Sequence, residues 1–133
     1  MAGWVLLDWD RKLSDVDSVE QLDTLLSSLC RLCKFPNGIA NLVSPKGHTL
    51  SLGISGRLGC LNYIDADENA PSLTVLGDPS LTYENGGVVN FMYEDQVTEI
   101  LRRNCVSVDV MLRAARHFYQ TEGLPDWLTW EEV

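Results

Sequence analysis

The chain has 133 residues, the length of one domain, and 45% of them are apolar, enough to form a core without disulfides or metal. Its formal net charge is −9, from 19 acidic and 10 basic side chains. This balance argues against binding to nucleic acid, which needs a basic surface, and against an anionic membrane surface. It suits a basic partner, because opposite fields raise the association rate, although acidity can also serve solubility alone. We expect one domain over residues 1–133.

The N-terminal segment predicts neither export nor membrane insertion. It lacks the basic stretch of a secretion signal, and Asp8 interrupts the apolar run Trp4–Leu7. No stretch has the apolar length of a transmembrane helix. We therefore expect a cytoplasmic protein whose four cysteines are reduced thiols: Cys30, Cys33, Cys60 and Cys105.

The first predicted elements are a short strand over Trp4–Asp10, a polar break over Ser14–Asp17, and a helix over about Ser18–Cys33. Ser18 and Gln21 have the spacing of a capping box, which favours a helix start at this point. Apolar residues then recur every three or four positions, which predicts one buried helix face. That face comprises Val19, Leu22, Leu25, Leu26, Leu29, Cys30 and Cys33.

A run of strands is predicted between residues 39 and 101. The turn Ser44-Pro45-Lys46-Gly47 joins the first two strands, and Leu50, Leu52 and Ile54 alternate with small residues, which indicates one buried face. The predicted strands are Ile39–Ser44, Thr49–Ile54, Cys60–Asp65, Ser72–Leu76, Val88–Tyr93 and Gln96–Leu101.

A second helix is predicted over about Ser107–Thr121, with Gly123 as its left-handed C-terminal cap. Trp127–Trp130 is predicted as a closing strand, whose pleat puts the two indoles on opposite faces, one packed inward and one available to a partner. Two helices flanking consecutive strands indicate an α+β fold. We expect an antiparallel sheet of about five to eight strands with the two helices packed on it, burying Leu25, Leu29, Leu112, Ala115 and Phe118.

The sequence contains no phosphate loop, dinucleotide fingerprint or nucleophile elbow. Cys30 and Cys33 form a C-x-x-C, but the pair closes a helix and continues its apolar stripe, which favours core packing over metal or redox chemistry. The two histidines, His48 and His117, have no neighbouring catalytic partner in the sequence. We therefore expect no enzyme activity and no catalytic, cofactor-binding or metal-binding residues.

The loops combine carboxylates with tyrosines, a composition typical of protein–protein contacts. Tyrosine buries a large area with few rotors, and flanking carboxylates attract a basic partner. We predict that the loop after residue 64 contacts a partner, because its carboxylates repel one another until a basic surface relieves them. The predicted partner-binding residues are Tyr63, Asp65, Asp67, Glu68, Glu84 and Glu94.

The C-terminal half resembles a family of bacterial immunity proteins that are encoded beside polymorphic toxins. The resemblance rests on the helix 108–121 with Ala115-Arg116-His117-Phe118-Tyr119, then Thr121, Pro125 and a closing Trp130-Glu131-Glu132. Upstream, the helix Ser18–Leu29 and these short motifs agree in order and spacing: Leu50-x-Leu52-Gly53-Ile54, Leu61-x-Tyr63, Leu76-Gly77-Asp78 and Phe91-x-Tyr93. The resemblance covers the chain apart from about Met1–Lys12. The family pattern includes Trp130 and not Trp127, which favours Trp130 as the inward indole and leaves Trp127 available to a partner.

Two positions depart from the family pattern. The family's Thr-Gly reads Thr121-Glu122 here, with glycine one place later, and a proline expected after Ile100 is Leu101. Both changes affect loop geometry, the first of them at the end of the second helix.

The resemblance implies a non-catalytic inhibitor that forms a heterodimer with a cognate toxin domain, most often a nucleic-acid deaminase. Such a toxin needs a basic surface for nucleic acid and a zinc pocket for the base, and an acidic inhibitor could cover both. The alternatives are a small-molecule sensor whose sheet and helices enclose a pocket, and a minor enzyme that uses carboxylates. A ligand-dependent shift in melting temperature without a protein partner would favour the sensor.

Overall fold

The computed structural model describes residues 3–8, 11–32, 38–55, 58–77, 87–93 and 96–133. The strands of this part are β1 (Trp4–Leu7), β2 (Leu13–Val16), β3 (Gly38–Val43), β4 (Thr49–Ser55), β5 (Leu58–Ile64), β6 (Leu73–Leu76), β7 (Val88–Tyr93), β8 (Gln96–Leu101), β9 (Cys105–Ser107) and β10 (Thr129–Glu132). The helices are α1 (Val19–Leu32) and α2 (Val108–Thr121), with a short 3-10 turn over Arg102–Asn104.

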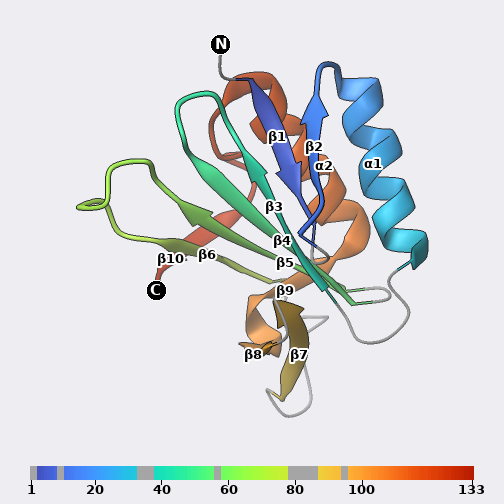
Figure 1. The fold of residues 1–133 in the computed structure, drawn as a ribbon. Helices are drawn as coiled ribbons and strands as arrows, with labels where there is room; N and C mark the ends of the chain where they lie inside the picture. The colour runs from blue at the N-terminus through green and yellow to red at the C-terminus, as the bar shows by residue number, and fades with distance from the viewer. Residues whose placement is uncertain (1–2, 9–10, 33–37, 56–57, 78–86, 94–95) are drawn as a thin grey trace.

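The sheet follows the order β10-β6-β5-β4-β3-β1-β2, and every neighbouring pair along this path is antiparallel. Beside this path, β9 pairs with β5, and the β7–β8 hairpin joins β3 through one parallel bridge. Both helices lie on the same side of the sheet (Figure 1). The α+β class and the antiparallel sheet carrying two helices are therefore confirmed, and the seven strands of the continuous path fall within the predicted range.

Helix α1 begins as its capping pattern predicts. The backbone N–H of Gln21 donates to Ser18 Oγ at 3.1 Å, and Gln21 Oε1 accepts from the N–H of Asp17 at 2.7 Å. The return bond thus reaches one residue earlier than in a standard capping box. Leu22, Leu26 and Leu29 are buried in the core, and Leu25 and Cys30 pack partly buried against it. Cys33 lies outside the described residues.

Helix α2 is capped at its start by Ser107, whose Oγ accepts from the N–H of Val110 at 3.2 Å. Its buried face is Met111, Ala114, Ala115 and Phe118, and Leu112 packs partly buried against the same core.

The predicted cap at Gly123 is wrong, because Glu122 adopts the left-handed conformation, with φ 58°. Its N–H donates to Phe118 O at 2.7 Å, which closes the helix one residue earlier than predicted. This is the position at which the family pattern has glycine.

Two strands were missed and one was misplaced by the sequence prediction. The polar break predicted over Ser14–Asp17 falls largely within β2 (Leu13–Val16), because pairing with β1 places Val16 opposite Trp4 and buries it to 3% exposure. The sequence of β2, Leu-Ser-Asp-Val, does not alternate apolar and polar residues, so it lacks the pattern of a half-buried strand. Cys105–Ser107 forms β9 immediately before α2, and the closing strand begins at Thr129 instead of Trp127.

The inward packing predicted for Trp130 is confirmed, but Trp127 lies before β10, so the two indoles do not share one strand. Trp130 lies opposite Val75 and packs against the core, and its indole N–H is 3.4 Å from Pro125 O. Trp127 is 43% exposed and stacks under the Arg113 guanidinium at 4.6 Å.

The two faces of the sheet differ in what covers them. Leu42, Leu50 and Leu61 on the helix-covered face are fully buried. On the opposite face the register aligns Asn41, Ser51 and Asn62 across β3, β4 and β5. The β7–β8 hairpin covers one end of this second face, where Phe91 is fully buried.

Gly53 makes that cover feasible. A Cβ at this position would lie 2.9 Å from the Phe91 ring and 2.3 Å from Cys60 Sγ. Only glycine leaves room for both side chains.

Candidate functional site

The loop between β5 and β6 is ordered by its own carboxylates. Asp65 Oδ1 accepts from the N–H of Asp67 at 2.9 Å, and Asp67 Oδ1 accepts from the N–H of Asn69 at 3.0 Å. Both are the local side-chain-to-backbone bonds with which aspartate stabilises turns. Two of the carboxylates that were expected to repel one another therefore also stabilise the loop, because they satisfy backbone donors.

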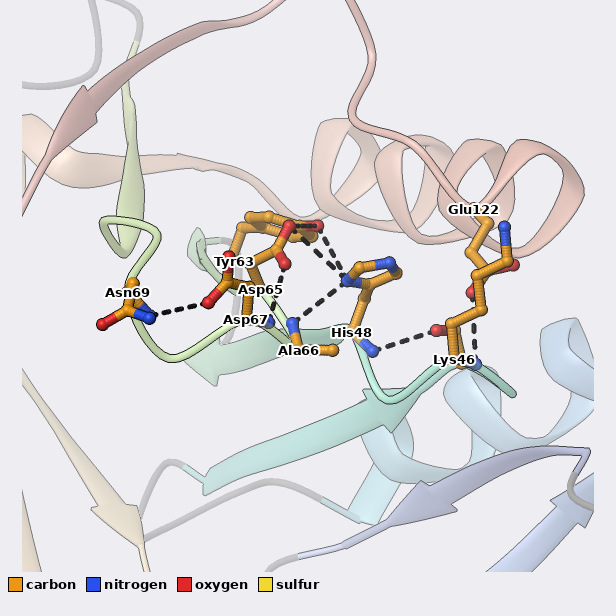
Figure 2. Close-up of polar contacts among 9 residues, drawn as sticks. Lys46, His48, Tyr63, Asp65, Ala66, Asp67, Asn69 and Glu122 are labelled. Carbon is orange, nitrogen blue, oxygen red and sulfur yellow. Dashed lines mark hydrogen bonds and ion pairs between the residues drawn. The ribbon is translucent and has the colours of Figure 1, made fainter.

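Asp65 also ties the loop to the sheet (Figure 2). The Tyr63 hydroxyl donates to Asp65 Oδ2 at 2.8 Å and lies 3.2 Å from His48 Nδ1. His48 Nδ1 accepts from the N–H of Ala66 at 3.1 Å. An acceptor at Nδ1 requires the neutral imidazole with its proton on Nε2. His48 therefore holds the first residues of the loop against the end of β5.

Tyr63 is a positioning residue for this loop. Its ring meets Phe118 edge-on at 6.1 Å and stacks on His48 at 6.0 Å, so it belongs to the margin of the core. Burial and the hydrogen bond to Asp65 raise the pKa of the Tyr63 hydroxyl to about 12. The neutral phenol is thus the form that the fold selects.

The turn before β4 is clasped to the end of α2 by contacts that the sequence reasoning missed. Glu122 Oε2 accepts from the N–H of Lys46 at 3.3 Å, and a hydrogen bond from Ser44, with this one, lowers the pKa of Glu122. Ser44 Oγ in turn accepts from the N–H of His48 at 3.0 Å.

The left-handed backbone of Glu122 costs a non-glycine residue about 1 kcal/mol. Its carboxylate offsets that cost by holding the turn that carries His48. In the sequence, the one feature that indicated this contact was a glutamate at position 122, where the family pattern has glycine.

Replacing Asp65 should alter how stability depends on pH. The N–H of Asp67, then the Tyr63 hydroxyl, lower the pKa of Asp65 below its ordinary 3.8. Because of this lowered pKa, the Asp65 carboxylate takes up its proton at a lower pH in the folded protein than in the unfolded chain. The stabilisation is therefore present above pH 3.8 and is lost as the pH falls further.

We expect Asp65→Asn to be less stable than the wild type at neutral pH and to lose less stability in acid. Urea unfolding at neutral pH and at about pH 3 measures both values. Glu68→Gln, an exposed carboxyl in the same loop, is the control. Parallel pH profiles for Asp65→Asn and the wild type would contradict the assigned contacts.

The structure separates the predicted partner-binding residues into two groups. Tyr63 and Asp65 are partly buried and build the loop, whereas Asp67 and Glu68 are exposed at its tip. Glu84 and Glu94 lie outside the described residues. In the described part of the site, Asp67 and Glu68 are therefore the predicted carboxylates best placed to meet a partner.

Within the described ranges, no group of three His, Cys, Asp or Glu side chains could hold a metal ion, and no helix is long and apolar enough to cross a membrane. Cys60 and Cys105 lie opposite each other on β5 and β9. Burial raises their thiol pKa values to about 12 and about 11. Both are protonated at neutral pH and are therefore poor nucleophiles and metal ligands.

A family model described as immunity protein Imm1 matches residues 11–132. The chain belongs to the Imm1 immunity protein family. The match confirms the resemblance drawn from the short motifs, and it begins within the segment Met1–Lys12 that they left uncovered. No curated protein matches the chain. Membership of the Imm1 family makes the chain an immunity protein, whose partner is a toxin.

Proposed function

We propose that this Imm1 protein neutralises a toxin that acts on nucleic acid, with a deaminase as the specific candidate, by covering the toxin's substrate-binding surface. The proposal rests on Asp67 and Glu68, which are exposed at the tip of an ordered loop in a chain of net charge −9. A nucleic-acid enzyme must present a basic surface to phosphates. An acidic protein with a preformed acidic loop is complementary to such a surface.

The inhibition is steric and electrostatic. A loop already ordered by Asp65 and His48 loses little conformational freedom on binding, so more of the contact energy remains as affinity. A deaminase must also admit the target base to a zinc pocket. An inhibitor seated over that entrance excludes the base, and the reaction stops without chemistry by the inhibitor, which in this proposal is not an enzyme.

Co-expression tests the proposal directly. The chain is produced together with the toxin domain encoded beside it, and growth, co-purification and conversion of cytosine or adenine in DNA and RNA are measured. We expect rescued growth, a stable complex and suppressed deamination. Rescue from a toxin that leaves nucleic acid unaltered would retain the immunity function and reject the nucleic-acid target.

Reversing the charges at the loop tip should slow association. We expect Asp67→Lys with Glu68→Lys to reduce the association rate by about tenfold or more at low salt, because opposite charges steer the encounter. The difference in association rate between the wild type and the variant should shrink at 1 M salt, where the Debye length is about 3 Å. Both side chains are exposed, and Asp67→Lys removes one local hydrogen bond from the N–H of Asn69, so stability should fall only slightly. Stopped-flow binding at two salt concentrations measures the effect.

A matched control separates local from overall charge. Glu20→Lys with Glu99→Lys changes the net charge from −9 to −5, as the loop variant does, but the changes lie on α1 and β8. We expect it to slow association less than the loop variant. Equal slowing by the two variants would mean that only net charge matters and that the loop is solvated surface.

A further inference from the structure

The face of the sheet opposite the helices carries a hollow of about 440 Å³. Its floor is formed by β3, β4 and β5, with Asn41, Ser51 and Asn62 side by side. Thr98 of the β7–β8 hairpin lines it on one side and Leu7 of β1 on another. The helices pack on the other face of the sheet (Figure 1). On the floor of the hollow Asn41 is 8% exposed, and Ser51 and Asn62 are half-buried.

None of the nine described residues that line the hollow is charged, although 22% of the chain is charged. The solvent face of an antiparallel sheet ordinarily carries polar and charged side chains. Depletion of charged side chains is typical of the centre of a protein–protein interface. The composition therefore differs from that of a merely solvated sheet face.

Apolar side chains surround this polar floor. Ile64 is 48% exposed, and Val43 and Leu7 are partly exposed. Leu13, paired with Leu7, extends the apolar strip to the edge strand and is 62% exposed. On the floor the Ser51 hydroxyl donates to Asn41 Oδ1. This hydrogen bond orients two side chains of the floor. Asn62 and Thr49 add an amide and a hydroxyl beside the apolar rim.

The charge distribution decides which partner fits. Ile64, which lines the hollow, directly precedes Asp65, so the acidic loop begins at this edge of the hollow. A second copy of the chain would bring another net charge of −9 to this surface, and like charges oppose that association. A basic domain meets the acidic loop favourably and can place an apolar side chain in the hollow.

We infer that this uncharged hollow is the centre of the toxin interface, where an apolar side chain and main-chain amides of the toxin are buried. The inference rests on the proposed function and extends it from the loop to the sheet face opposite the helices. The acidic loop then governs the encounter, whereas contacts in the hollow govern the lifetime of the complex, as expected for rim and centre.

Substitution of Ile64 tests the inference. We expect Ile64→Arg to accelerate dissociation from the toxin domain encoded beside the chain by at least about tenfold, as for a central interface residue. The association rate should change less. Leu101→Arg is the matched control, because Leu101 is 49% exposed and does not line the hollow; its complex should dissociate within about twofold of the wild-type rate.

Melting temperatures of the free proteins establish that each variant folds. If Ile64→Arg does not fold, Ile64→Ser provides the same test by removing apolar area alone. A folded Ile64 variant that dissociates at the wild-type rate overturns the inference. So does a wild-type homodimer that Ile64→Arg dissociates without weakening toxin binding, because the hollow then joins two copies.

The two proposals fail in distinguishable ways. If the wild-type chain binds no toxin domain, the proposed function fails, and with it the inference. If the wild type binds, the loop variant slows association and the Ile64 variants behave as wild type, then the proposed function stands and only the hollow is excluded from the interface.

Discussion

Phe118→Ala should lower the free energy of unfolding by about 3–5 kcal/mol, the range for large buried aromatic residues. Phe118 is fully buried on α2 and meets Trp4 edge-on at 5.2 Å and Tyr63 at 6.1 Å. Its removal leaves a cavity between β1, β5 and α2. Equilibrium unfolding in urea, with an unchanged slope, measures the loss.

Trp127→Ala is the control for Phe118→Ala. Trp127 is 43% exposed, and its described ring contact is the Arg113 guanidinium. An exposed cation–π pair is worth about 1 kcal/mol or less, so the control should unfold close to the wild type. Equal losses in the two variants would contradict the assignment of Phe118 to the centre of the core.

Gly77→Ala should destabilise the protein by about 3 kcal/mol or more, the upper range for overpacking. A Cβ at this position would lie 1.8 Å from the carbonyl oxygen of Cys105 and 3.1 Å from that of Arg103. The obstacle is backbone, which cannot rotate aside as a flexible side chain can. The N–H of Gly77 also donates to Arg103 O at 2.7 Å, so relief of the clash strains that bond.

Gly87→Ala provides the matched control, because a Cβ there meets no described atom within 4 Å. We expect its melting temperature to stay near that of the wild type. If Gly77→Ala had the same melting temperature as Gly87→Ala, then the end of β6 and β9 would lie farther apart than in the structure.

Regular local patterns made much of the fold predictable from sequence. Both helices bury the faces that their three-and-four spacing indicates, and Ser18 caps α1 as its pattern predicts. Strand β8 has the predicted bounds. A helix or strand repeats its apolar positions along a few neighbouring residues, so the buried face is encoded within the segment itself. The family, too, was recognisable because its motifs are short and ordered along the chain.

The candidate site was predicted only in outline. The sequence identified a loop rich in carboxylates, but it could not tell that Asp65 turns toward Tyr63 while Asp67 and Glu68 face solvent. That difference depends on His48, which comes from another strand boundary and accepts the N–H of Ala66. The burial of a carboxylate is set by neighbours in space, and these are not its neighbours in sequence.

Contacts between distant segments were decided by the tertiary structure alone. Lys46 and Glu122, whose hydrogen bond joins the turn before β4 to the end of α2, are 76 residues apart. The strand β2 exists because β1 offers its edge to four residues of which two are polar. The hollow exists because β3, β4 and β5 align their uncharged residues on the face opposite the helices. The sequence by itself determined which faces are apolar and which family the chain resembles. Pairing, register and the face opposite the helices required the tertiary structure, because their energy comes from contacts that form only when remote segments meet.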